Sequence, residues 1–238
     1  MEWEIGSNIM EFELFEANNG LCPYLDNRNW RSYTFKAQNI GDDIYESLID
    51  NGFRRSGQYF YKNSCSGCKE CISIRVPIDS FKMTKSQKRT WKKNQDLTIT
   101  WKPVEFDQES YELYYKYSDV RHGTITTEQN YRDFLINTAV NTIMMQYHKD
   151  TKLMGIGWVD VLPKSLSSVY FAFDPDFEKR RLGVFSVLKE IELAEMLHKS
   201  VLHIGFWVQE CKSMSYKGDY KPYELLINEK WVTPDASD

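Results

Sequence analysis

Three cysteines lie three residues apart in the segment from Cys65 through Cys68 to Cys71, and Cys22 lies upstream of them. Four thiolates can hold Zn²⁺ or an iron–sulfur cluster, because both bind sulfur ligands strongly. Gly67 eases the turn that such wrapping needs. We therefore predict a metal or cluster site at Cys22, Cys65, Cys68 and Cys71, with zinc and iron–sulfur both open. Reduced thiols that bind no metal are the alternative.

A second group of residues is cationic and has no acidic residue among its members. It consists of Lys82, Lys85, Lys88, Arg89, Lys92 and Lys93. On a helix, most of these side chains share one face. Such a face attracts phosphates through Coulomb attraction and the release of counterions. A solvated helix face is the alternative, but solvated faces usually alternate lysine with acidic residues. We therefore predict that this stretch contacts nucleic acid.

Two adjacent arginines, Arg54 and Arg55, lie between Gly52 and Gly57. Arginine binds a phosphate or a carboxylate through two parallel hydrogen bonds, which lysine cannot do. We predict that both arginines help to hold the same nucleic acid. A basic turn at the surface is the alternative.

The elements that must position these residues follow from the hydrophobic periodicity. Before residue 95, the pattern predicts a helix over 42–51 and strands over 59–61 and 72–78. After it, the pattern predicts a strand over 97–101, helices that begin near 107 and after 127, an antiparallel meander over 142–147, 155–161 and 169–173, a helix over 183–198, and strands over 201–208 and 223–227. We divide the chain into a cysteine-containing, basic unit over 1–95 and a second unit over 96–238.

The order of elements in the second unit resembles the N-acetyltransferase (GNAT) fold. We therefore predict an α+β protein with a GNAT-like mixed sheet flanked by helices, preceded by the cysteine-containing unit. GNAT proteins that bind acetyl-CoA usually carry small residues where a helix N-terminus holds the pyrophosphate. Here Gly183 is present, but Phe185 occupies the place of a small residue. Its ring is expected to obstruct the pyrophosphate, which favours a different acyl donor.

Composition limits the class of protein. The chain has 238 residues, which is enough for one large domain or two small ones. Its formal net charge of −4 argues against non-specific coating of nucleic acid but leaves room for a local basic face. The acidic start lacks the basic region of a secretory signal, and no apolar run is long enough to span a membrane. We expect a cytoplasmic protein without membrane contact, whose five cysteines stay reduced or bind metal.

Several short motifs are distributed along most of the chain. They include Cys22-Pro-Tyr-Leu25, Gly52-Phe-Arg-Arg-Ser-Gly57, the three-cysteine segment, Ser86-Gln-Lys-Arg89, Arg121-His-Gly123, Asp174-Pro175, Gly205-Phe-Trp207, Met214-x-Tyr216-Lys217 and Pro222-x-Glu224. Together these motifs resemble the arginyl/leucyl-tRNA–protein transferases of the N-degron pathway, whose bacterial form is aspartate/glutamate leucyltransferase. Two positions depart from the family's usual pattern: Thr124 replaces a glycine, and Arg181 replaces a serine.

The resemblance implies transfer of an amino acid, leucine in the bacterial form, from charged tRNA to the N-terminal α-amine of a protein that begins with Asp or Glu. The donor is an activated ester, and an α-amine with a pKa of about 8 is partly neutral at neutral pH. Orientation, proton removal and oxyanion stabilisation are therefore enough, without a cofactor for the chemistry. The resemblance implies catalytic roles for Asp174, Tyr170, Tyr216 and Lys217, substrate binding by Arg75, Arg121, His122 and Glu224, and tRNA binding by Arg54, Arg55 and the six cations from Lys82 to Lys93.

Two other functions stay open at this point. One is a GNAT-type acetyltransferase that uses acetyl-CoA, against which Phe185 counts and which a CoA titration tests. The other is a non-enzymatic tRNA-binding module, against which the long second unit counts and which an aminoacyl-transfer assay tests. The sequence leaves open which amino acid is donated and which N-terminal residues are accepted.

Overall fold

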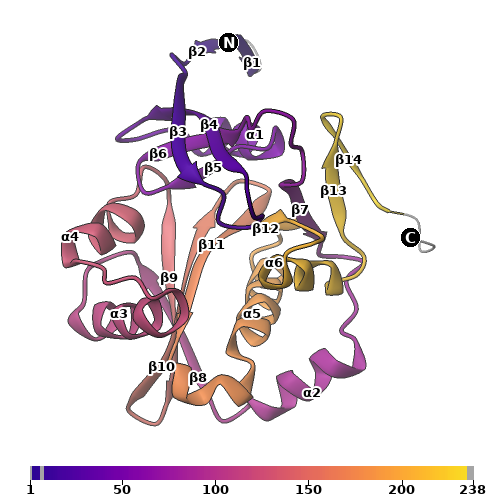
Figure 1. The fold of residues 1–238 in the computed structure, drawn as a ribbon. Coiled ribbons are helices and arrows are strands. Elements are labelled where there is room, and N and C mark those ends of the chain that lie inside the picture. The colour runs from indigo at the N-terminus through magenta and orange to yellow at the C-terminus, as the bar shows by residue number, and fades with distance from the viewer. Residues whose placement is uncertain (1, 6–7, 235–238) are drawn as a thin grey trace.

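The structure is a computed structural model that describes residues 2–5 and 8–234 (Figure 1). Its largest element is an eight-stranded sheet with the strand order β14-β13-β7-β12-β11-β10-β9-β8. These strands span Lys230–Val232 (β14), Glu224–Ile227 (β13), Ile72–Pro77 (β7), Val201–Trp207 (β12), Ser165–Phe173 (β11), Lys152–Val161 (β10), Thr142–Lys149 (β9) and Thr98–Pro103 (β8). The sheet contains parallel and antiparallel pairs and is flanked by helices, as predicted for the α+β class.

A smaller four-stranded sheet, with the order β3-β4-β6-β5, lies above the large sheet in Figure 1. Its strands span Phe15–Leu21 (β3), Asn29–Lys36 (β4), Arg54–Ser56 (β5) and Tyr59–Asn63 (β6), and a hairpin of β1 (Glu2–Ile5) and β2 (Asn8–Glu11) precedes them. Helix α1 (Asp42–Asp50) buries Tyr45 and Leu48 against this sheet, beside Phe60. The helix predicted over 42–51 is therefore confirmed, and it provides the core of the smaller sheet.

The meander of β9, β10 and β11 confirms the three antiparallel strands predicted from the sequence. Successive side chains of a strand point to opposite faces. Met144 of β9 accordingly packs in the cluster that holds Leu113 of α3 (Gln108–His122), whereas Met145 packs in the cluster that holds Leu188 of α5 (Leu182–Met196). Helices α3 and α5 therefore cover opposite faces of the large sheet.

Strands β11 and β12 begin side by side and then separate. They pair in parallel from Ser165 opposite Val201 to Ser167 opposite His203, although β11 continues to Phe173 and β12 to Trp207. The separation leaves the second half of each strand free to line a hollow between them. That hollow is the site described below.

Strand β7 corrects the division of the chain after residue 95. It comes from the first predicted unit but lies inside the large sheet, antiparallel to β12 on one side and to β13 on the other. The first 95 residues therefore do not form a unit of their own. Pro77 is the last residue of β7, a position that suits a residue without a backbone N–H.

Shorter elements complete the chain. They are α2 (Lys85–Lys93), α4 (Glu128–Tyr131), the wider helical turn Arg132–Ile136, the 3-10 turns Pro175–Arg180 and Tyr216–Asp219, and α6 (Lys212–Ser215). Helix α2 begins with a capping box of Thr84 and Gln87, and its Trp91 packs against Phe185 of α5. Within the described ranges, no helix has both the length and the apolar character needed to cross a membrane.

Candidate active site

A cavity of about 890 Å³, here called the central cavity, opens where β11 and β12 separate. Its walls come from β11, β12, the start of α5, the segment 213–217 and the smaller sheet. The residues that line it include six of those predicted from the sequence: Arg54, Arg55, His122, Tyr170, Tyr216 and Lys217. The fold therefore gathers predicted site residues from distant parts of the chain into one hollow.

Lys217 provides a proton acceptor in the central cavity. Its Nζ donates a hydrogen bond to the backbone carbonyl oxygen of Phe206 at 2.8 Å. Burial of the ammonium, and next the positive charge of Arg54, lower the pKa of Lys217 to about 7. A large share of these amines is therefore neutral near neutral pH, and a neutral amine can accept a proton.

Gly205 of β12 makes room for two cationic side chains. Its φ of +89° lies in the region that favours glycine. A Cβ added there would lie 3.2 Å from Lys217 Nζ and 3.9 Å from a terminal guanidinium nitrogen of Arg54. Both cations therefore approach the same small stretch of backbone, and a larger residue would displace Lys217.

Two tyrosines provide hydroxyl groups on the cavity wall. The Tyr170 hydroxyl lies 3.3 Å from His122 Nε2. Burial raises the pKa of Tyr170 above its ordinary value and raises the pKa of Tyr216 to about 12. Both hydroxyls keep their protons at neutral pH, so each can donate a hydrogen bond to an oxygen that develops negative charge.

Glu190 of α5 is a buried acid next to the cavity wall that sequence reasoning missed. The Ser168 hydroxyl, which lines the cavity, lies 3.4 Å from Glu190 Oε1, and Oε2 has no hydrogen-bond partner among the described residues. Burial raises the pKa of Glu190 to about 8, so most of this carboxyl group is protonated at neutral pH. The only signal in the sequence is an acid inside a helix whose stripe is otherwise apolar.

Asp174 does not line the central cavity, so its position does not favour the catalytic role expected of it. It is 2% exposed and lies between Lys116 Nζ at 2.6 Å and Lys152 Nζ at 2.8 Å. Burial raises its pKa, but the hydrogen bonds from the two lysines outweigh that effect and lower it overall. A carboxylate held in this way is a weak base, and here it ties the end of β11 to α3.

Arg75, Arg121 and Glu224 also lie away from the central cavity, in contrast to their predicted role in substrate binding. Arg75 Nε pairs with Glu224 at 2.6 Å, and its Nη1 pairs with Asp50 at 2.9 Å. Arg121 pairs with Glu178 at 2.9 Å. Because acids already compensate both arginines, their positions do not favour recognition of an acceptor.

Arg55 is buried and already paired with an acid. Its Nε donates to Asp160 Oδ2 at 2.8 Å, and its Nη2 donates to the Thr142 hydroxyl at 2.9 Å. The side chains of the pair are 1% and 0% exposed. Because Asp160 already compensates its charge, the position of Arg55 does not favour the predicted phosphate contact, although both Arg54 and Arg55 line the central cavity.

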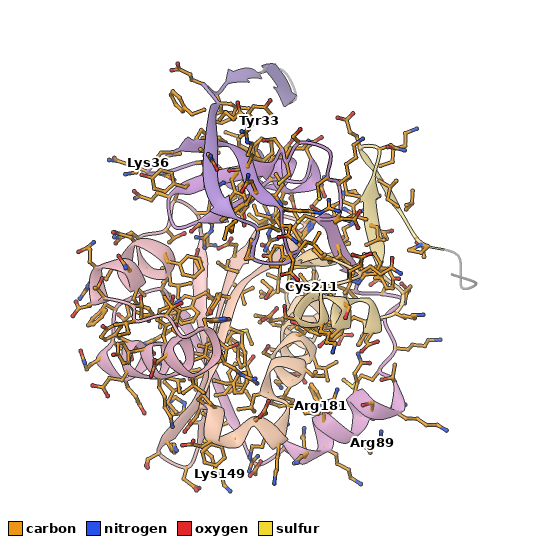
Figure 2. All side chains as sticks on the ribbon, in the orientation of Figure 1. Tyr33, Lys36, Arg89, Lys149, Arg181 and Cys211 are labelled. Atoms are coloured by element: carbon orange, nitrogen blue, oxygen red, sulfur yellow. The ribbon has the colours of Figure 1, made fainter. Side chains whose placement is uncertain are left out.

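The six cations predicted to contact nucleic acid are all exposed, and we call them the basic face: Lys82, Lys85, Lys88, Arg89, Lys92 and Lys93. The apolar and uncharged side of α2 packs on α5, which explains why the charges face solvent. Arg181, at the start of α5, donates to the Ser86 hydroxyl at 2.8 Å and so lies beside α2 (Figure 2). Gly183, two residues later, lines the central cavity. The basic face and the cavity therefore adjoin at the start of α5.

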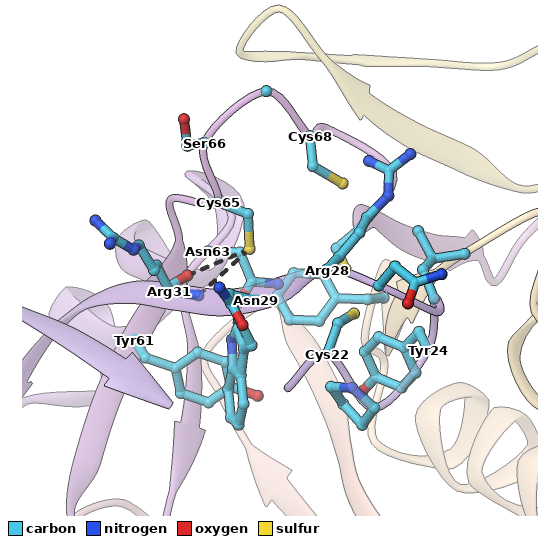
Figure 3. A pocket seen from close by; sticks show the side chains of 17 residues that line it. Cys22, Tyr24, Arg28, Asn29, Arg31, Tyr61, Asn63, Cys65, Ser66 and Cys68 are labelled. Carbon is cyan, nitrogen blue, oxygen red and sulfur yellow. Dashed lines mark hydrogen bonds between the residues drawn. The ribbon is translucent and has the colours of Figure 1, made fainter. Parts of the chain in front are cut away.

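The four predicted ligand cysteines surround a second hollow of about 550 Å³ (Figure 3). Burial, and next the nearby thiols, raise the pKa of Cys71 to about 12. Cys65 Sγ accepts a hydrogen bond from the Arg31 backbone N–H at 3.4 Å. Among the described residues, no group of three or more His, Cys, Asp or Glu side chains is arranged to hold a metal ion. The thiols therefore share one hollow without forming a metal site as they lie.

The two hollows share part of one wall. Tyr24, Trp30, Tyr61 and Phe206 line both of them. The thiols are therefore separated from the central cavity by aromatic side chains that belong to both.

Phe185 does not obstruct a ligand in the way the sequence suggested. It is 1% exposed and packs in the core, against Trp91 and Tyr147. A Cβ added to Gly183 would meet nothing within 4 Å, so the start of α5 is open. The ring is therefore a core residue, and the case against acetyl-CoA needs other support.

The comparisons with known proteins supply that support. Residues 20–89 match the family model described as arginine-tRNA-protein transferase, N terminus, and residues 109–227 match the model of its C terminus. An aspartate/glutamate leucyltransferase from Hahella chejuensis is 36% identical over 232 residues, which cover 95% of this chain and 99% of that protein. The enzyme of the same name from Chromobacterium violaceum is 35% identical over 217 residues, with 89% and 90% covered.

Among solved structures, the fold is similar to the C-terminal domain of a protein assigned as a lysylphosphatidylglycerol synthetase, from Agrobacterium fabrum. The TM-score is 0.50 at 13% identity, and the match covers 84% of this chain and 65% of that chain. This likeness agrees with the predicted GNAT-like architecture of a mixed sheet flanked by helices.

Proposed function

The chain belongs to the arginine-tRNA–protein transferase family, and from that premise we propose that it transfers leucine from leucyl-tRNA to the N-terminal α-amine of proteins that begin with aspartate or glutamate. The relatives' shared name supports this donor and these acceptors. An aminoacyltransferase that gives a protein an N-terminal leucine acts in the N-degron pathway. Because charged tRNA is made in the cytoplasm, we place the reaction there.

One observation carries the proposal at the level of chemistry: Lys217, with a pKa of about 7, lies in the central cavity. In the reaction, the acceptor's α-amine attacks the ester carbonyl carbon of the aminoacyl-tRNA. A C–N bond forms, the ester C–O bond breaks, and the ribose hydroxyl of the terminal nucleotide leaves. The attacking nitrogen must lose one proton, and the neutral Lys217 amine accepts it.

The remaining roles follow from the cavity wall. Lys217, once protonated, returns that proton to the leaving ribose oxygen, so the amine ends neutral as it began. Tyr216 and Tyr170 donate hydrogen bonds to the carbonyl oxygen as it gains negative charge. The Tyr216 hydroxyl suits this task because its pKa of about 12 keeps it protonated. His122 orients Tyr170 through the contact at 3.3 Å.

The basic face is proposed to hold the tRNA. Its six exposed cations adjoin the start of α5, and Gly183 at that point lines the cavity. A tRNA on the basic face therefore has a short route by which its aminoacylated end reaches Lys217. Positive charge without intervening acid also gives binding the strong salt dependence of phosphate contacts.

A transfer assay with radiolabelled leucyl-tRNA tests the proposal. Peptides that begin with Asp, Glu, Asn, Arg and Met are offered in parallel, and arginyl-tRNA and acetyl-CoA serve as competing donors. We expect leucine to reach the Asp and Glu peptides in preference to the others. Arginine transfer in place of leucine would reassign the donor, and acetyl transfer would restore the acetyltransferase alternative.

A further inference from the structure

We propose that Arg54 recognises the acceptor by pairing with the carboxylate of its N-terminal Asp or Glu side chain. This inference rests on the proposed function and assigns one residue to its acceptor preference. From the sequence alone, Arg54 is placed with the tRNA-binding residues, and substrate binding is assigned to Arg75, Arg121, His122 and Glu224. The positions of these residues in the structure point to the reassignment.

Arg54 is a buried cation that lacks an acid. It is 8% exposed, lines the central cavity, and donates a hydrogen bond from its guanidinium to the backbone carbonyl of Ser168. Among the described residues, no carboxylate lies within ion-pair distance of it, whereas Arg55 is paired with Asp160. An uncompensated cation in a protein interior is costly, so the arrangement is complementary to an anion that arrives with a ligand.

Glu190, the buried acid that interacts with Arg54, does not compensate its positive charge. Glu190 and Arg54 influence each other electrostatically, but no ion pair joins them in the described structure. Burial keeps most of the Glu190 carboxyl protonated at neutral pH, so it adds little negative charge beside Arg54. The positive potential of Arg54 in the cavity therefore remains available to a substrate.

Arg54 and Lys217 lie close enough together to contact the two charged groups of one acidic N-terminal residue. Both side chains approach Gly205, at 3.9 Å and 3.2 Å from the position of its absent Cβ. In aspartate, the α-amine and the side-chain carboxylate are attached to neighbouring carbons, and glutamate adds one methylene. Arg54 therefore takes the carboxylate while Lys217 faces the amine. Asparagine has a similar shape but no charge to offer to Arg54.

A tRNA phosphate is the other anion that Arg54 could bind, but the burial of the Arg54 side chain disfavours that contact. A backbone phosphate belongs to a bulky, strongly hydrated polymer, whereas a single N-terminal side chain can reach a buried arginine on the cavity wall. The basic face already offers six exposed cations outside the cavity. We therefore assign Arg54 to binding of the acceptor, and binding of the tRNA donor by Arg54 is the alternative outcome of the test.

The test compares acceptor preference in Arg54→Gln, Arg54→Lys and the wild-type enzyme. The measured quantity is kcat/KM for an Asp-starting peptide divided by kcat/KM for the matching Asn-starting peptide, at saturating leucyl-tRNA. We expect Arg54→Gln to lower this ratio about 10- to 100-fold, because a hydrogen-bonded charge is lost. Arg54→Lys is expected to give an intermediate ratio, because it keeps the charge but not the paired donors. Gln retains a donor for the Ser168 carbonyl.

Arg132→Gln is the matched control, because Arg132 is paired with Glu128 on the surface and lies outside the cavity. It should keep the wild-type ratio. An unchanged ratio in Arg54→Gln overturns the assignment. If the ratio is unchanged and the KM for leucyl-tRNA is higher, Arg54 binds the tRNA donor instead of the acceptor. If Arg54→Gln does not fold, as judged by thermal unfolding, a wild-type ratio in Arg54→Lys overturns it equally. Failure of the proposed function looks different, because the wild-type enzyme itself would transfer no leucine to the Asp peptide.

Discussion

Arg55 of β5 and Asp160 of β10 form a buried, two-point ion pair that joins the smaller sheet to the large one. Removing one partner leaves an uncompensated charge in the interior, so Arg55→Met is expected to cost about 3–5 kcal/mol of the free energy of unfolding. Replacing both partners, in Arg55→Met with Asp160→Leu, should recover much of that loss. Urea denaturation of the single and double variants measures both values. Equal losses of unfolding free energy in the single and the double variant would show that the uncompensated charge is not the cause of the loss.

The acid limb of the pH–rate profile should report on Lys217. Its pKa is lowered to about 7, so the neutral form that accepts a proton is present above that pH and is lost below it. Activity is therefore expected to fall as the pH drops through about 7. The acceptor amine, with a pKa of about 8, contributes a second limb.

Lys217→Gln separates the two limbs. We expect about a 10²- to 10⁴-fold lower kcat and a profile that keeps only the limb of the acceptor amine. A variant that loses kcat but retains the limb near 7 would assign that limb to another group. Peptide binding, measured separately, controls for simple loss of the acceptor site.

Glu190 should make the protein less stable as the pH rises. Its pKa is raised from 4.5 to about 8 on folding, so the folded state binds the proton more tightly than the unfolded chain does. The resulting stability is fully present below 4.5, declines as the pH rises, and is lost as the pH passes through about 8. Glu190→Gln, which cannot ionise, should flatten this decline.

Denaturation of wild-type and Glu190→Gln protein between those two pH values measures the effect. The difference in unfolding free energy is expected to shift by an amount on the order of a few kcal/mol in favour of the variant at the alkaline end. Parallel curves for the two proteins would show that Glu190 does not carry the pH dependence.

Reversal of charge on the basic face should weaken tRNA binding. In the triple variant Lys85→Glu, Arg89→Glu and Lys92→Glu, the affinity should fall and the slope of log affinity against log salt should become shallower. The matched control reverses three exposed lysines elsewhere: Lys36, Lys164 and Lys230. Equal losses in both variants would mean that net charge, and not this surface, governs binding.

The thiol hollow yields a prediction about metal. Because the thiols are not arranged around an ion as they lie, binding should be accompanied by movement of the segment 65–71. We propose that protein purified without oxygen holds zinc or iron, and that Cys68→Ser lowers the content. Elemental analysis and an optical spectrum check this. Only trace metal in the wild-type protein would leave the cysteines as reduced thiols.

Local patterns in the sequence were enough for the elements whose partners are close along the chain. The meander of β9 to β11 and helices α1 and α5 follow from the hydrophobic pattern and the turn segments between them, both of which are local features of the sequence. Strand β3 was missed because only one of its seven positions is even half-buried, so it shows no alternation.

The site residues show where sequence reasoning stops. Arg54 and Arg55 are neighbours in a strand, so their side chains leave it on opposite sides. The sequence alone does not indicate which of the two pairs with a buried acid. Asp174 stands in a recognisable motif, yet two lysines distant in sequence, Lys116 and Lys152, decide that it is held as a carboxylate. Such contacts depend on tertiary packing, which periodicity does not report.

The position of β7 also has a consequence for how the chain is made. This strand leaves the ribosome early, but both strands that flank it, β12 and β13, are synthesised near the end of the chain. Until they emerge, both edges of β7 lack their native partners, and unpaired strand edges invite association with other chains. The enzyme therefore cannot complete its central sheet during synthesis, and the nascent chain is expected to depend on chaperones until its last strands are released.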